Sequence, residues 1–370
     1  MAPKRRDIYR GRHRLRIPVT LIVTVLVILI VAAILLFNSL RKYAVYGKDG
    51  VTLASPGLTA EEETSSPEAS SAPRTPAPVN KVEAELVIEE ADYSAVDLHP
   101  GAELTAIKGK YISNAQLMAG AVGGLGTASE ACSALVLEMV TPQGTLSWAS
   151  SSTIAQSYGV NGQADLGELV AALKDKGYSL IAEINCCRST LLAKRSPSLA
   201  LKNAIGEPYT DEEGGWLDPY DLTVRGYLLS LAEELAEAGF DEILFSGLSF
   251  PANDAVVSYS EPHIGATTPR AAVSGLAVYL ARNAPEGVRT GVMLIRSAVD
   301  GTGDPEKESP QDAELMSRIF DRLYLATDPG YFQSDAAAVS ALLGEDGALR
   351  FVPVMGSAPG SDCYMLTIPD

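Results

Sequence analysis

The sequence predicts an α/β protein whose main part is a (β/α)8 barrel of the TIM type. Eight apolar, strand-like runs alternate with helical patterns after residue 105, and parallel strands require crossover helices of this kind. The stretch from residue 106 to residue 370 also has the size of one such barrel. An open doubly wound sheet is the alternative. It usually has a glycine-rich phosphate turn after its first strand, and residues 120–126 are only a weak candidate for one.

A long apolar segment near the N-terminus predicts a transmembrane helix over residues 17–37. The segment carries no charge and, at about 1.5 Å per residue, can cross a hydrocarbon core roughly 30 Å thick. Seven basic residues and one acidic residue lie in residues 1–16, so the positive-inside rule places this tail in the cytoplasm. A cleavable signal peptide is the alternative, but its apolar core is usually shorter. We therefore expect a single-pass plasma-membrane protein whose C-terminal domain lies outside the cytoplasm.

The part beyond the membrane is acidic and begins with a linker. Of the 46 acidic and 29 basic residues in the chain, 45 and 22 follow residue 16, which leaves a net charge of −23 there. Such a surface repels nucleic acid, so we expect no nucleic-acid partner. Residues 38–80 are rich in Ser, Pro and Glu and have little to bury, which predicts a disordered linker. Residues 81–105 form a transition that the pattern does not assign.

The barrel strands are expected at residues 107–112, 134–140, 179–184, 242–245, 290–295, 322–326, 351–355 and 363–368. Apolar spacing predicts a helix that includes residues 166–173 and ends at Gly177. Helices should also follow the cap-and-proline pairs Asp218-Pro219, Thr268-Pro269 and Ser309-Pro310, and a further one covers residues 334–343. Only residues 356–362 separate the last two strands, so the seventh helix should be missing.

The cysteines and histidines favour neither a disulfide framework nor a metal site. Cys132 and Cys363 adjoin strand-like runs and have the character of small buried side chains. Cys186 and Cys187 are neighbours on a strand, so they should point to opposite faces. The three histidines are far apart in the sequence, and no Cys-x-x-Cys pair occurs. We expect no metal and no cofactor.

Three stretches of the sequence resemble one known family. They are SPSLALKNAIGEPY (196–209), GGWLDPYD (214–221) and AGFDEILFSGLSFP (238–251), and the resemblance runs from AIKGKYIS (106–113) to LYLATDPGYF (323–332). The family is the glycoside hydrolase-like barrel domain of bacterial envelope proteins, an uncharacterised relative of barrel glycosidases. The resemblance implies a (β/α)8 barrel with a carbohydrate ligand, and therefore a cell-envelope glycan as partner.

The sequence departs from the family pattern at the strand ends, where active sites of such barrels lie. Ser246 stands where the family typically has Asp, Ser249 where it has Arg, and Met293 where an Asp is usual. Glycoside hydrolysis ordinarily needs two carboxylates beside the bond, so these replacements favour a catalytically degenerate barrel, a pseudoenzyme that binds carbohydrate. The aromatic residues expected to stack on sugar rings are Trp216, Tyr220, Tyr259 and Tyr331.

An active glycosidase that uses Glu138 and Glu183 is the second hypothesis. Both residues should lie at the ends of neighbouring strands, and two close carboxyl groups repel, which raises one pKa as a general acid requires. The family has Arg where Glu183 stands. The competing interpretation is a structural ion pair of Glu183 with Arg188 or Lys108.

Two acids in a loop, Asp254 and Glu261, are further catalytic candidates just beyond the fourth strand. A third hypothesis is a protein-interaction scaffold of the cell envelope. It fits the membrane anchor and the linker equally well, and nothing in the sequence separates it from the other two.

Overall fold

The computed structural model describes residues 44–47, 50–53, 92–98, 103–251, 257–258, 268–302, 310–344 and 347–367. The chain divides into two units, Met1–Val82 and Glu83–Asp370. In the first unit, β1 (Ala44–Gly47) and β2 (Gly50–Leu53) pair as an antiparallel hairpin within the range predicted as linker. The predicted transmembrane segment, residues 17–37, lies outside the described residues. Among those described, no helix has the length and apolar character needed to span a membrane.

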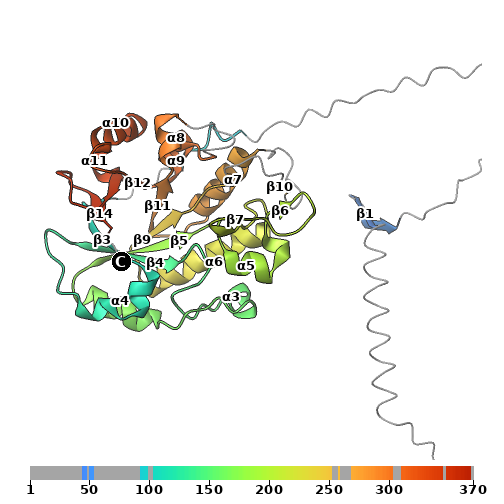
Figure 1. Cartoon of the computed structure of the whole chain (residues 1–370), viewed down its shortest axis with the longest axis horizontal. Helices are drawn as coiled ribbons and strands as arrows, with labels where there is room; N and C mark the ends of the chain where they lie inside the picture. The colour runs from blue at the N-terminus through green and yellow to red at the C-terminus, as the bar shows by residue number, and fades with distance from the viewer. Residues whose placement is uncertain are drawn as a thin grey trace, which may run out of the picture. The chain divides into compact units, whose positions relative to one another are not determined.

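The second unit contains a closed barrel of eight parallel strands (Figure 1). Each strand pairs with the next one along the chain, and the last pairs with the first. The closure confirms the (β/α)8 prediction and excludes the open sheet. The strands are β3 (Lys108–Ile112), β4 (Ala134–Val140), β5 (Ser179–Asn185), β9 (Glu242–Ser246), β11 (Arg289–Leu294), β12 (Arg322–Ala326), β13 (Phe351–Met355) and β14 (Tyr364–Leu366).

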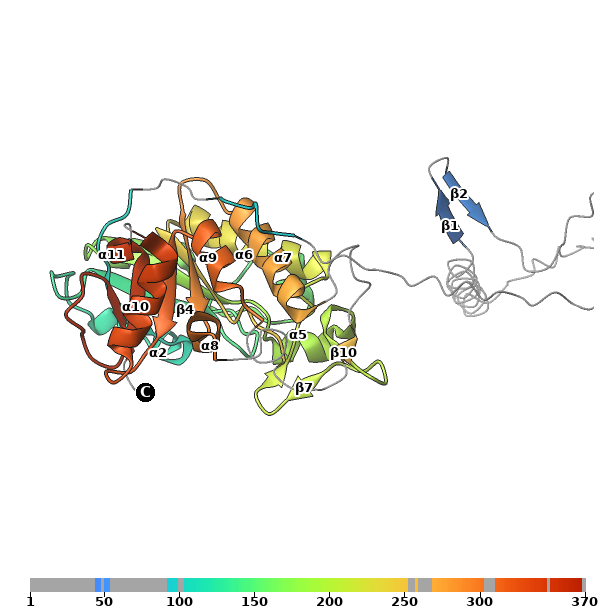
Figure 2. The same cartoon turned by 90° about the horizontal axis from the view of Figure 1, so that it is seen from above.

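Helices surround this barrel (Figures 1 and 2). The longer ones are α4 (Leu166–Lys174), α6 (Leu222–Ala238), α7 (Pro269–Arg282), α9 (Ala313–Ile319) and α10 (Phe332–Leu343). The shorter ones are α2 (Asn114–Met118), η1 (Ala121–Gly124), α3 (Thr153–Ser157), α5 (Thr190–Arg195), η2 (Pro197–Leu199), α8 (Arg296–Asp300) and α11 (Gly347–Arg350). The connection between β13 and β14, residues 356–363, contains no helix, which confirms the predicted gap.

The helix caps confirm one sequence prediction and correct two. Thr268 caps α7 through its side chain, and Pro269 is the first helical residue, as expected. The cap of α6 is Asp221 instead of Asp218, and its carboxylate accepts hydrogen bonds from Thr223 and Val224. The helix predicted from Ser309-Pro310 starts later, because Asp312 caps α9. In both corrected cases an aspartate three residues downstream of the predicted cap is the actual cap, and local spacing could not choose between the two residues.

The apolar residues form two layers on either side of the strands. One cluster fills the space between the strands and the surrounding helices. The other fills the barrel interior with Ile107, Ala134, Val136, Ile181, Leu244, Tyr324, Val352, Val354, Cys363 and Met365. At the amino ends of the strands, the interior is closed by an ion pair between Glu242 and Arg322, each only 1% exposed. Any ligand that uses the barrel interior must therefore enter from the carboxyl ends.

Two long connections meet beside the barrel (Figure 2). The segment between β5 and α6 contains α5, η2, β6 (Lys202–Asn203), β7 (Thr210–Asp211) and β8 (Gly214–Gly215). The segment between β9 and α7 contributes β10 (Val257–Ser258), which pairs with β6. Both connections leave from carboxyl ends of strands, so they supply walls for a site at that end.

Part of the unassigned transition packs on the barrel helices. Tyr93, Val96 and Leu98 contact the outer apolar cluster, and the Leu98 amide donates to the Arg318 carbonyl of α9 at 3.1 Å. Residues 92–98 thus belong to the folded domain and precede β3 as a strap.

Candidate functional site

The fold brings Glu138, Glu183 and Ser246 together at one rim of the barrel. Glu138 pairs in register with Glu183 on the neighbouring strand, and Asn185 pairs with Ser246 on the next strand along. Side chains alternate along a strand, and the residues two positions earlier all belong to the interior cluster, namely Val136, Ile181 and Leu244. The three side chains therefore face the barrel interior at its carboxyl end, which confirms the prediction that they share a rim.

The Glu138 carboxylate is held in place by the loop after β3. Its Oε2 accepts a hydrogen bond from the Asn114 amide at 2.8 Å. The Asn114 side chain in turn donates to Ser147 Oγ at 2.6 Å, and Ser147 Oγ donates to the Glu138 carbonyl at 2.9 Å. Just after Glu138 the pairing skips Met139, so β4 ends in a bulge, a feature that often re-aims side chains beside sites.

Glu183 is the most perturbed acid of this rim. Burial raises the pKa of its carboxyl, the neighbouring Glu138 carboxylate raises it further, and contacts with the hydroxyls of Ser246 and Tyr111 lower it. The residue as a whole is half-buried, but Oε2 is shielded from solvent and completes no hydrogen bond among the described residues. A shielded carboxyl beside a second carboxylate is favoured in its protonated form.

The ion pair considered from the sequence does not form. Arg188 contacts Asp211 at 3.2 Å and Glu213 at 2.7 Å, and its guanidinium lies 4.1 Å above the ring of Trp216. Lys108 begins β3 at the opposite, amino end of the barrel. Glu183 is thus neutralised by neither of these cations, and the predicted ion pair with Arg188 or Lys108 is wrong.

The positions predicted to be degenerate also lie around the mouth. Ser246 is 5% exposed and ends β9, and Met293 packs against the interior cluster from β11. Ser249 is half-buried, and its backbone amide contacts Cys187. Gly247 has φ +60, and a Cβ there would lie 2.6 Å from the Asn185 side chain, so this turn requires glycine.

The aromatic residues predicted to bind sugar differ in how far their rings are exposed to solvent. Trp216 and Tyr220 are 2% and 1% exposed, so neither ring offers a face to a ligand, which corrects that prediction. Trp216 instead donates from Nε1 to Asp211 at 2.7 Å, and Tyr220 donates to the Thr268 carbonyl at 2.8 Å. Tyr331 is 57% exposed and remains available. Tyr259 lies outside the described residues, as do the candidate acids Asp254 and Glu261.

Arg296, the first residue of α8, lies against the Tyr331 ring. The Arg296 guanidinium lies 4.6 Å from the ring centroid and donates to Asp335 at 2.8 Å and to Thr327 at 3.2 Å. Sequence reasoning missed Arg296, together with Tyr111 and Asn114 on the Glu138 side. Tyr111 could have been found from strand alternation, since it lies four residues after Ile107, whose side chain faces the barrel interior.

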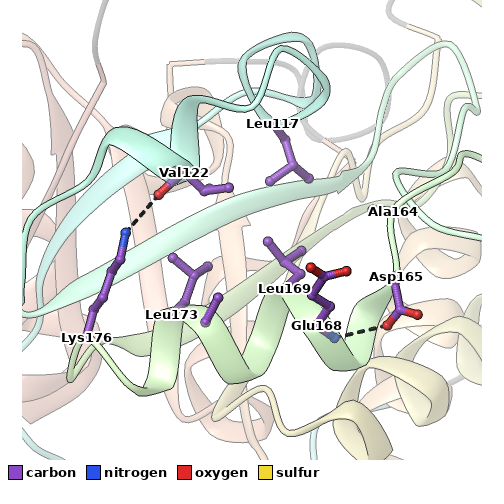
Figure 3. Close-up of a pocket in the computed structure, with 10 residues that line it drawn as sticks. Leu117, Val122, Ala164, Asp165, Glu168, Leu169, Leu173 and Lys176 are labelled. Carbon is purple, nitrogen blue, oxygen red and sulfur yellow. Dashed lines mark hydrogen bonds between the residues drawn. The ribbon is translucent and has the colours of Figure 1, made fainter.

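A separate groove lies outside the mouth, between η1, α2 and α4 (Figure 3). Its volume is about 290 Å³, and its walls are mostly apolar, from Leu117, Val122, Leu169 and Leu173. The Lys176 ammonium beside this groove is engaged within the protein, because it donates to the Val122 carbonyl at 3.2 Å. Across the described part of the chain, no group of three or more His, Cys, Asp or Glu residues could hold a metal ion.

Several solved structures are similar to this chain. A hypothetical protein from Ruminiclostridium thermocellum ATCC 27405 has 21% identity and a TM-score of 0.41, over 49% of this chain and 95% of that one. A GH20 exo-β-N-acetylglucosaminidase from Vibrio harveyi has 9% identity and a TM-score of 0.43, over 68% and 41%. The spore cortex-lytic enzyme SleL of Bacillus cereus has 10% identity and a TM-score of 0.39, over 69% and 52%. The match spans less than two thirds of the last two proteins.

A search of curated proteins gives no match. The sequence profile of a family described as "Putative glycosyl hydrolase domain" matches residues 114–336, which is more than half of the chain. This range includes β4, β5 and β9 with both rim glutamates. The chain therefore belongs to this glycosyl hydrolase-like barrel family.

Proposed function

We propose that the protein is a glycoside hydrolase whose two catalytic carboxyl groups are Glu183 and Glu138. The observation that carries this proposal is the register pairing of the two glutamates on adjacent strands at the open end of the barrel. Family membership supports the reaction class. The engagement of Arg188 with Asp211 and Glu213 supports it further, because that cation does not neutralise Glu183.

The two carboxyl groups have environments that suit different roles. Glu183 has a raised pKa, which suits the general acid that protonates the leaving-group oxygen. Glu138 accepts a hydrogen bond from the Asn114 backbone amide, which holds its carboxyl group in a fixed position. A carboxylate there can stabilise, or attack, the anomeric carbon as the glycosidic bond breaks.

We infer retention of configuration, because the two glutamates pair in register on adjacent strands, whose backbones lie about 4.8 Å apart. Retaining enzymes hold their carboxyl groups about 5–5.5 Å apart, against about 6.5–9.5 Å for inverting ones. In this mechanism the Glu138 carboxylate forms a covalent bond to the sugar while Glu183 gives its proton to the departing oxygen. Water then breaks the sugar–Glu138 ester, and Glu183 takes back a proton.

Hydrolysis assays on the full chain test this proposal. We would measure release of 4-methylumbelliferone from glucoside, galactoside, N-acetylglucosaminide and N-acetylgalactosaminide substrates, together with solubilisation of peptidoglycan. Glu183→Gln and Glu138→Gln should each lower kcat by about 10²–10⁴-fold. Glu168→Gln is the matched control, since Glu168 is an exposed glutamate on α4 that belongs to none of the barrel strands, and it should leave kcat unchanged. Activity that survives both rim substitutions would refute the assignment.

A carbohydrate-binding barrel without catalysis is the second candidate. The uncharged side chains of Ser246 and Met293, at strand ends where the family resemblance implies acids, favour it. The same assays separate the two, because this candidate predicts glycan binding with no hydrolysis. The exposed ring of Tyr331, backed by Arg296, would supply a stacking surface in either case.

We also propose that residues 17–37 anchor the protein in the plasma membrane, with the barrel outside the cytoplasm. The uncharged run of that segment and the basic residues before it support this orientation. Protease added to intact protoplasts should degrade the chain beyond residue 45. A protected C-terminal domain would overturn the orientation.

A further inference from the structure

Two shielded polar atoms at the barrel mouth lack hydrogen-bond partners. They are Ser246 Oγ and Glu183 Oε2, each inaccessible to solvent and each without a partner among the described residues. Buried polar atoms in folded proteins are nearly always hydrogen-bonded, to protein or to ordered water. Two of them in one place therefore mark a position for a further polar atom.

The two atoms belong to side chains that face each other across β5 and β9. Both side chains point into the barrel. The Ser246 hydroxyl is close enough to the Glu183 carboxyl to lower its pKa, but the two side chains do not complete a hydrogen bond with each other. The other groups that face Glu183 are the Glu138 carboxylate from β4 and the Tyr111 hydroxyl from β3, while the buried Cys186 thiol follows directly after β5. Ser246 itself ends its strand beside Gly247, whose lack of a side chain leaves Asn185 in place.

We infer that Ser246 is a positioning residue, whose hydroxyl and Glu183 Oε2 together hold one oxygen atom: a water before substrate binds, and a hydroxyl of the sugar when a glycan is bound. This inference rests on the proposed function for its substrate. A sugar or water hydroxyl can bond to both atoms, because it donates one hydrogen bond and accepts others. The serine hydroxyl can do the same. The Glu183 carboxyl donates to that oxygen when it is protonated and accepts from it when it is ionised. The sugar ring next to Glu183 must then carry a free hydroxyl at that point.

The chemistry also explains why an uncharged residue suits position 246. A carboxylate there would place a third negative charge beside Glu138 and Glu183, and like charges disfavour one another's ionised forms. A serine can orient the Glu183 proton without adding charge. The residue that first suggested a degenerate site thus has a role in a working one.

A titration of Glu183 in the full chain tests the positioning role without any substrate. Protein labelled with ¹³C at the glutamate side-chain carboxyls is titrated by NMR, and the Glu183 signal is identified by its loss in Glu183→Gln. Ser246→Ala should move the Glu183 midpoint upward, because it removes a contact that lowers the pKa. Ser246→Thr keeps the hydroxyl and should leave the midpoint near that of the native protein. Ser274→Ala removes a buried serine on α7, 3% exposed, and should not move it.

Kinetics on the 4-methylumbelliferyl glycosides test the sugar hydroxyl. Ser246→Ala should raise KM roughly fivefold, the equivalent of one ordinary hydrogen bond, and Ser246→Thr should restore it. If the midpoint shifts but no glycoside is cleaved, the positioning contact stands and the proposed function fails. If glycosides are cleaved through Glu183 but Ser246→Ala changes neither midpoint nor KM, the inference is overturned and the proposed function survives. A midpoint shift with unchanged KM would show that only water occupies the position, which overturns the sugar contact.

Discussion

The ion pair that closes the amino end of the barrel should be the most sensitive point of the fold. Arg322 bonds Glu242 directly, and the Tyr324 hydroxyl donates to the other carboxylate oxygen at 2.6 Å. The same guanidinium donates to the backbone carbonyls of Leu349 at 3.1 Å and Thr105. Both charged residues are 1% exposed, so solvent cannot compensate the loss of either.

The substitution Arg322→Met keeps an apolar stem of similar length but leaves the Glu242 carboxylate buried without a cation. Breaking a buried pair in this way costs about 3–5 kcal/mol. The double variant Arg322→Met with Glu242→Gln should recover part of that loss, because no uncompensated charge remains and the amide oxygen can still accept from Tyr324. The stability losses of the single variants Arg322→Met and Glu242→Gln should therefore not add in the double variant.

Urea unfolding of the full chain measures these values. The two tryptophans of the chain, Trp148 and Trp216, are both buried in the barrel, so their fluorescence reports its unfolding. Arg282→Met, an exposed arginine in the last turn of α7, is the control and should change stability by less than about 0.5 kcal/mol. A loss below about 1 kcal/mol for Arg322→Met, or a double variant as unstable as the sum of the two singles, would refute the argument.

Three further predictions concern the rim and the strap. The raised pKa of Glu183 means that the folded protein loses stability as pH rises through it, so Glu183→Gln should be more stable than the native protein at pH 8. Each tenfold difference in the proton affinity of Glu183 between the folded and unfolded states contributes about 1.4 kcal/mol to this difference in stability. The two proteins should become equally stable below about pH 4, where the carboxyl is protonated in both states. Equal unfolding midpoints at pH 8 would contradict this prediction. Tyr331→Ala should weaken binding of any glycan that the native protein binds by about 2–10-fold in calorimetry, whereas Tyr331→Phe should not. Tyr93→Ala should lower stability by about 1–2 kcal/mol, since the half-buried ring packs on the domain, and an unchanged urea midpoint would show that the strap is dispensable.

The sequence by itself determined the strand and helix order of the barrel. Apolar periodicity located all eight strands within a few residues, and the short connection after residue 355 correctly predicted the absence of a helix there. Thr268-Pro269 gave a correct helix start because both the cap and the proline act within one turn. These features depend on neighbours in the chain, so local chemistry was enough to predict them.

The tertiary structure decided which charged residues meet. Sequence spacing left Glu183 with Arg188, Lys108 or Glu138 as possible partners, and only strand register and the turn after β5 selected Glu138. The tertiary structure also buried Trp216 under the Arg188 guanidinium, a contact that no local sequence pattern indicated. A charge interacts with whatever folding brings within a few ångströms, and in a closed barrel those neighbours come from separate strands far apart in the sequence.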